Sequence, residues 1–120
     1  MELSLQTSID GAVRIDTLGK ITRDGWPPHY DPLVECYGSN EIYSQRLLLN
    51  LENSGHIDST GVEWLLEANK KFNQNSGVMV LHSAKPMITE LLKMMRMHLV
   101  LHIASDEMEA RHKLESSSQT

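Results

Sequence analysis

The residues best suited to chemistry stand together in one short stretch. Residues 47–61 read LLLNLENSGHIDSTG, an apolar run followed by a polar loop and three oxygen-bearing side chains. Asp58, Ser59 and Thr60 have the composition of a helix start. Free backbone N–H groups and the positive end of the helix dipole would stabilise a phosphate on Ser59 or Thr60. The stretch is therefore a candidate phosphoacceptor site.

Helix capping is a simpler use of the same residues. Asp, Ser and Thr are preferred N-caps, and Thr60 with Glu63 three residues later matches a capping box, worth ~1 kcal/mol. Because such sequences open many ordinary helices, residue chemistry alone favours capping over phosphorylation. One site could serve both purposes, and both interpretations stay open at this point.

The first third of the chain predicts a β-hairpin and a short helix. The hairpin rests on alternating apolar residues and a turn signal, namely Leu3, Leu5, Val13, Ile15 and the turn Asp10-Gly11. The sequence Trp26-Pro27-Pro28 favours extended backbone. Asp31 followed by Pro32 is typical of a cap and a first helical residue, which predicts a helix over 33–37.

Strands and helices alternate in the rest of the chain. The predicted strands are 47–51, 78–81 and 99–103, and the predicted helices are 62–72, 87–95 and a last one capped by Ser105. The leucine run at 47–51 has the character of a central strand buried on both faces. This order predicts an α/β fold, with an N-terminal hairpin followed by βαβαβα, helices packed on a mixed sheet and right-handed crossovers. A single domain is expected over 1–114, followed by a disordered Ser-rich tail at 115–120.

Composition excludes several classes of function. The net charge is −5 and no Lys/Arg cluster is present, so direct nucleic-acid binding is not expected. No segment approaches the ~20 apolar residues of a membrane span, and the single Cys36 cannot form an intrachain disulfide, so we expect a cytoplasmic protein without membrane insertion. No nucleophile, base and acid follow a catalytic motif spacing, and the protein is not expected to be an enzyme.

Other residues have a structural and a functional interpretation. His98 and His102 would share a face, but no Cys or carboxylate at ligand spacing accompanies them, so no metal site is predicted. His56 could contact a partner, although a solvated loop histidine is favoured. Trp64 could anchor a partner or lie in the core. The methionines at 87, 94, 95 and 97 could form an adaptable binding face, although core packing is the favoured use.

The segment Ile57-Asp58-Ser59-Thr60-Gly61 after an apolar strand resembles the Asp-Ser-Ser/Thr-Gly motif of STAS domains, the fold of the anti-sigma factor antagonists. The resemblance covers about 13–110 and extends to the order of the later helices and strands. The chain departs from the family pattern at Val62-Glu63-Trp64, where a small residue is common, at 95–99, where a glycine is common, and at Trp26-Pro27-Pro28, where the first helix is unlike the family's.

The resemblance implies a function and its residues. Ser59 would be phosphorylated, with Thr60 as the alternative. The implied partner-binding residues are His56, Asp58, Ser59, Thr60, Gly61, Glu63 and Trp64. The implied protein is a transcription regulator that needs no cofactor, binds an anti-sigma factor acting as a serine protein kinase, and is reset by a PP2C-type phosphatase.

Two other functions stay open. The chain could be a non-phosphorylated STAS scaffold or accessory subunit of a signalling or transport complex, which the unusual residues 26–37 favour. It could also sense a small ligand, for which it would need a pocket near those residues. Homodimer formation is left open as well.

Overall fold

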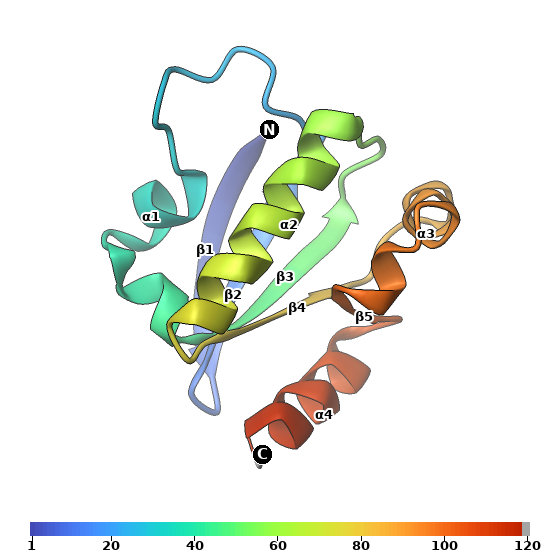
Figure 1. The fold of residues 1–120 in the computed structure, drawn as a ribbon. Helices are drawn as coiled ribbons and strands as arrows, with labels where there is room; N and C mark the ends of the chain where they lie inside the picture. Colours follow the sequence, from blue (N-terminus) through green and yellow to red (C-terminus); the bar gives the residue numbers. More distant parts are fainter. Residues whose placement is uncertain (119–120) are drawn as a thin grey trace.

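A computed structural model describes residues 1–118 of the chain. A five-stranded sheet has the order β1-β2-β3-β4-β5. The strands are β1 (Glu2–Ile9), β2 (Ala12–Leu18), β3 (Arg46–Asn53), β4 (Val78–His82) and β5 (His102–Ala104). β1 and β2 form the predicted antiparallel hairpin, whereas β2, β3, β4 and β5 pair in parallel. The predicted α/β class and mixed sheet are therefore confirmed (Figure 1).

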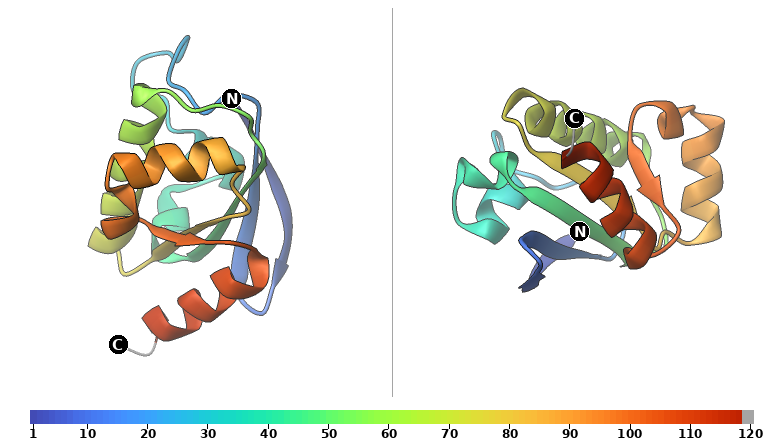
Figure 2. Two further views of the ribbon diagram at one scale, coloured as in Figure 1. Left: turned by 90° about the vertical axis from the view of Figure 1, so that its right-hand side faces the viewer. Right: turned by 90° about the horizontal axis from the view of Figure 1, so that it is seen from below.

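The helices lie in two layers, one on each side of the sheet (Figure 2). The α-helices are α1 (Pro32–Tyr37), α2 (Ser59–Gln74), α3 (Pro86–Met94) and α4 (Glu107–Ser118), and two short 3₁₀ helices are η1 (Asn40–Ser44) and η2 (Met97–Leu99). The predicted cap of α1 is confirmed, because Asp31 accepts hydrogen bonds from the backbone N–H groups of Leu33 and Val34. No helix within residues 1–118 combines the length and the apolar character needed to cross a bilayer.

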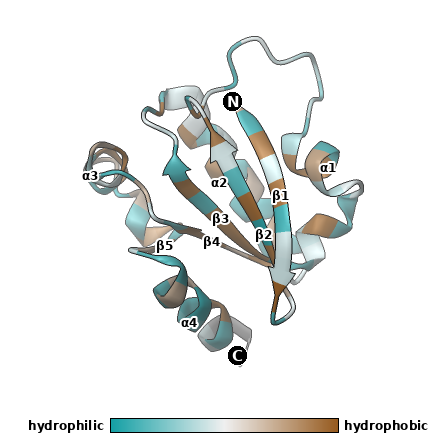
Figure 3. Cartoon of the chain, turned by 180° about the vertical axis from the view of Figure 1, so that it is seen from behind, coloured by the Kyte–Doolittle hydropathy of each residue, from teal (hydrophilic) through white to brown (hydrophobic). Residues whose placement is uncertain are grey.

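The leucine run of β3 contributes to the hydrophobic cores on both faces of the sheet. Leu47 and Leu49 face a large core that α1, α2 and α3 cover, whereas Leu48 faces a smaller core with Ala110 and Leu114 of α4. Successive strand residues point to opposite faces, so a continuous apolar run suits a strand buried on both sides. Seen from the side opposite α2, hydrophobic residues dominate β3 and β4, whereas β1 and β2 alternate (Figure 3).

The structure differs from the predictions at the C-terminal end. β5 begins at His102, not at residue 99, because Leu99 belongs to η2 and Val100 follows it, both exposed. Asp106 caps α4 in place of Ser105: its Oδ1 accepts from the N–H of Glu109 at 2.8 Å. The Ser105 hydroxyl instead donates to the Glu109 carboxylate. Helix α4 continues to Ser118, past the predicted start of a disordered tail at residue 115, and residues 119–120 lie outside the described part.

Candidate functional site

The predicted site lies between the end of β3 and the start of α2 (Figure 1). Residues 19–22, which follow β2, pair with this loop. Gly19 N–H donates to the Asn53 carbonyl at 3.1 Å, Ile21 N–H donates to the His56 carbonyl at 2.9 Å, and Asp58 N–H donates to the Ile21 carbonyl at 3.3 Å. The main chain of the loop is therefore fixed against a neighbouring segment, and the side chains that follow are held in place.

Asp58 connects the polar groups of the site. Its Oδ1 accepts from the N–H of Gly61 at 2.9 Å and from the Thr60 hydroxyl at 2.7 Å, and its Oδ2 accepts from the Thr22 hydroxyl at 2.6 Å. The Lys20 ammonium lies 3.6 Å from Oδ2. The hydrogen bonds from Thr22, Thr60 and Gly61 hold the pKa of the Asp58 carboxyl well below its usual range. Asp58 is thus an ionised N-cap at neutral pH.

Thr60 is part of the same network. Its hydroxyl donates to Asp58 and accepts a hydrogen bond from the backbone N–H of Arg23 at 2.9 Å. Thr60 is the second residue of α2, so the predicted capping box of Thr60 with Glu63 is wrong, and Asp58 is the cap. Glu63 instead lies 3.7 Å from the Arg23 guanidinium. The Thr60 hydroxyl is already engaged on both its donor and its acceptor side.

Ser59 differs from both of its neighbours. It is the first residue of α2 and its side chain is exposed. Within the described part of the chain, no group forms a hydrogen bond with its hydroxyl. The Ser59 oxygen can therefore be approached from solvent without breaking an existing contact.

Gly61 brings α2 very close to the segment that follows β2. A Cβ atom at this position would lie 2.1 Å from the Ile21 carbonyl oxygen and 2.7 Å from its carbon. Only a residue without a side chain fits there. Gly61 therefore sets the distance between the start of α2 and residue 21, and it is buried.

The remaining predicted site residues divide between surface and interior. His56 and Glu63 are exposed. Trp64 is only 4% exposed and packs edge-on against Trp26, with ring centroids 6.0 Å apart, so the core alternative is the one observed. Thr22 and Arg23 were not predicted from the sequence, because they lie about 36 residues before Asp58 and Thr60, their hydrogen-bond partners. Parallel pairing of β2 with β3 could have predicted these contacts, because residues that follow two parallel strands meet at one edge of the sheet.

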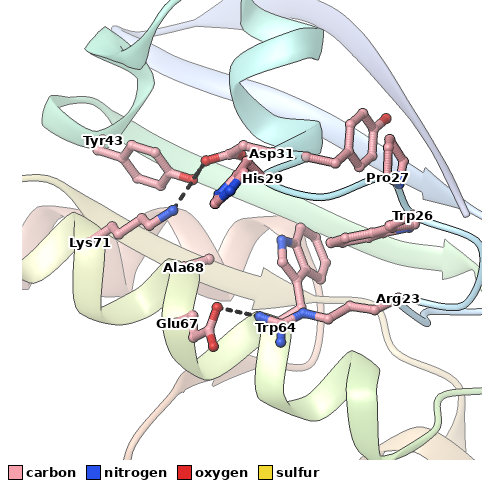
Figure 4. A pocket seen from close by; sticks show the side chains of 11 residues that line it. Arg23, Trp26, Pro27, His29, Asp31, Tyr43, Trp64, Glu67, Ala68 and Lys71 are labelled. Atoms are coloured by element: carbon pink, nitrogen blue, oxygen red, sulfur yellow. Dashed lines mark hydrogen bonds and ion pairs between the residues drawn. The ribbon is translucent and has the colours of Figure 1, made fainter.

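A pocket of about 500 Å³ lies between residues 23–31 and α2 (Figure 4). Trp26, Tyr30 and Trp64 give it an aromatic wall. Arg23 pairs with Glu67 on one side, and Asp31 accepts from the Tyr43 hydroxyl at 2.5 Å and lies 3.3 Å from the Lys71 ammonium on the other. The charged groups of the pocket are thus already paired within the protein. Elsewhere in residues 1–118, no three His, Cys, Asp or Glu side chains gather as a metal site would require.

Comparison with known proteins decides the family. The family model for the STAS domain matches residues 3–110. The chain belongs to the STAS domain family. The motif Asp58-Ser59-Thr60-Gly61 of this STAS domain therefore occupies the helix start that the resemblance implied, and the expected fold is the one observed.

Solved structures share the fold of this STAS domain. A candidate anti-sigma factor antagonist from Thermotoga maritima is 15% identical, with 94% of each chain covered and a TM-score of 0.78. The unphosphorylated anti-sigma factor antagonist SpoIIAA is 14% identical, with 94% of this chain and 97% of that chain covered and a TM-score of 0.59. A STAS domain protein from Planctomyces limnophilus is 16% identical, with 98% and 99% covered and a TM-score of 0.62. No curated protein sequence matches the chain.

Proposed function

We propose that this STAS domain is an anti-sigma factor antagonist that works as a phosphorylation-controlled partner switch in the cytoplasm. The observation that carries the proposal is the contrast between two adjacent hydroxyls. Thr60 is held by Asp58 and Arg23, whereas Ser59 is exposed and has no hydrogen-bond partner in the described chain. A kinase needs a hydroxyl that it can reach, and Ser59 is that hydroxyl.

The unmodified protein binds an anti-sigma factor that is also a serine protein kinase, and so frees the sigma factor. The kinase transfers the γ-phosphoryl group of ATP to the Ser59 oxygen, which loses its proton, and ADP leaves. A PP2C-type phosphatase hydrolyses the ester with water and releases inorganic phosphate. The STAS domain is the substrate and the switch, and it catalyses neither step.

Charge explains how the modification would weaken the complex. A phosphate adds about −1.5 to −2 charges at neutral pH. Asp58 precedes Ser59, and Glu63 follows it by one helical turn, in a chain whose net charge is −5. The N-terminus of α2 tolerates the new charge within the protein, whereas a partner surface pressed against Ser59 must desolvate it. The fold survives phosphorylation while the contact is lost.

The test uses three baits in an affinity capture from the source organism, with identification by mass spectrometry. These are the wild type, Ser59→Asp, and Ser116→Asp, which places the same charge on an exposed serine of α4. Circular dichroism must first establish that all three are folded. We expect a serine kinase or anti-sigma factor on the wild type and on Ser116→Asp, and its loss from Ser59→Asp.

The alternative is a non-phosphorylated scaffold or accessory subunit of a signalling or transport complex. The aromatic packing of Trp26 on Tyr30 and Trp64, which gives residues 23–31 a fixed shape, favours it. Identical partners on all three baits would support this alternative and contradict the switch.

A further inference from the structure

A second surface with a binding character lies on and after α3. Five of the nine large hydrophobic side chains that are exposed in the described chain fall between residues 87 and 100. They are 41–79% exposed and are called the α3 surface here: Met87 (61%), Met94 (79%), Met95 (41%), Leu99 (71%) and Val100 (53%). The prediction that the methionines serve core packing is wrong for the first three of these residues.

Packing of α3 does not require these side chains. Ile88 and Leu92 are fully buried and fix α3 on the sheet. Met97 is half-buried and packs against the same core. Clustered exposed apolar groups on a small protein mark an interaction site, whereas single ones need no explanation.

Helix α3 lies on the side of α2 opposite residues 23–31, which line the pocket (Figure 1). The Asn69 amide of α2 donates to the Val100 carbonyl at 3.3 Å, which places the end of the α3 surface against α2. α3 follows β4 and α2 follows β3, and parallel pairing puts both helix starts at one edge of the sheet. The start of α3 and Ser59 therefore lie on the same edge of the molecule.

Charge distinguishes this region from the rest of the chain. Residues 85–100 contain three cationic side chains, Lys85, Lys93 and Arg96, and one acidic side chain, Glu90. All four are exposed. The stretch is thus net positive in a chain whose net charge is −5. Its electrostatic complement is an acidic surface.

We propose that the α3 surface docks an amphipathic segment of a partner protein, with apolar side chains flanked by Asp or Glu. Unbranched methionines adapt to an apolar partner, and the cations around them pair with its acids. The proposal does not depend on phosphorylation of Ser59.

An anionic membrane and a second copy of this chain are less suitable partners for the α3 surface. An anionic membrane would attract the cations, but Glu90 lies on the exposed side of α3 between Met87 and Met94, where it would meet lipid head groups of its own charge. A second copy placed by two-fold symmetry would bring Lys93 and Arg96 of each protomer toward the other's cations. A protein segment can offer Glu90 a cation and the rest of the surface acids.

The test compares substitutions of equal chemistry on two surfaces. Met94→Glu and Leu99→Glu change the α3 surface, whereas Met108→Glu changes a side chain on α4 that is 72% exposed. Thermal unfolding must show that all three stay folded. All three serve as baits with the wild type and Ser59→Asp, and each captured protein is then purified for calorimetric titration.

We expect one purified partner that binds the wild type and Met108→Glu equally and binds Met94→Glu and Leu99→Glu at least tenfold more weakly. Its affinity should fall with added salt, and its bound segment should be apolar and acidic. Equal retention of every protein by Leu99→Glu and Met108→Glu would overturn the proposal. So would Leu99-dependent binding to vesicles with 30% phosphatidylglycerol, or Leu99-dependent dimerisation in sedimentation, without such a partner. A partner lost by Leu99→Glu but kept by Ser59→Asp would support this proposal, whether or not a kinase is lost from Ser59→Asp.

Discussion

On the side of α2 that faces residues 22–31, the aromatic, charged and hydroxyl side chains contact other residues of the chain. Trp64 packs on Trp26, Arg23 pairs with Glu63 and Glu67, and the Thr60 hydroxyl is held on both sides. Along the other flank, α3 exposes methionine side chains and η2 exposes Leu99. Ser59 stands at the head of the helix between them. The residues that build the site are therefore distinct from those whose side chains remain accessible to another molecule.

The largest expected effect tests this contrast in side-chain packing. Replacing Trp64 with Ala removes a buried aromatic side chain and should lower the free energy of unfolding by about 3–5 kcal/mol. Met94→Ala on the exposed flank should change it by less than about 0.5 kcal/mol. Urea unfolding followed by circular dichroism measures both. Similar losses at the two positions would show that the flanks do not differ.

Alanine substitutions at Gly61 and Gly55 test how closely the main chain packs at each position. Gly61→Ala forces a methyl group against the Ile21 carbonyl and should cost about 2–3 kcal/mol. At Gly55 a Cβ would meet no heavy atom within 4 Å, so Gly55→Ala should stay within about 0.5 kcal/mol of the wild type. The same urea titration compares them. A tolerated Gly61→Ala would mean that residue 21 and α2 can move apart.

The two adjacent hydroxyls should differ by a smaller amount. Thr60→Val leaves the Arg23 N–H and the Asp58 carboxylate short of one partner each, which should cost about 1–2 kcal/mol. Ser59→Ala removes no hydrogen bond seen in the described chain and should be neutral within about 0.5 kcal/mol. If Ser59→Ala were the more damaging change, Ser59 would have a structural role that the contacts do not reveal.

The smallest expected effect is a change in how the free energy of unfolding depends on pH when Asp58 is replaced. Hydrogen bonds lower the pKa of the folded Asp58 carboxyl below its unfolded value of about 3.9. The ionised group therefore stabilises the fold above that value, and its contribution is lost as the pH falls from about 5 toward the lowered pKa. Asp58→Asn should flatten the dependence of unfolding free energy on pH in this range, as measured by urea unfolding at a series of pH values. A slope equal to the wild type's would contradict the account of Asp58.

Local signals were enough to predict most of the fold. The unbroken leucine run of β3, the turn at Asp10-Gly11 and the Asp31-Pro32 cap act through neighbouring residues, so the sequence states them directly. Ser59 and Asp58 were found in the same way. The predicted phosphorylation and partner contacts at these residues stay predictions.

The sequence was least informative where a side chain contacts a segment that is distant in the sequence. Asp58, and not Thr60, caps α2, and the side chains of both residues are also hydrogen-bonded by Thr22 and Arg23, which follow β2. Apolar spacing likewise placed Met87 and Met95 in the core, yet Ile88 and Leu92 are the side chains of α3 that are fully buried. Periodicity reports a preference for burial, and the neighbouring elements decide which side of the helix is covered.

The most direct test of the central claim is the modification state of the native protein. We would isolate it from source cells in growth and under stress, and map phosphate by intact mass and fragmentation. We expect phosphate on Ser59 in one condition, its loss in another, and none on Thr60. Phosphate on Thr60 would contradict the assignment to Ser59, and an unmodified chain in every condition would contradict the switch.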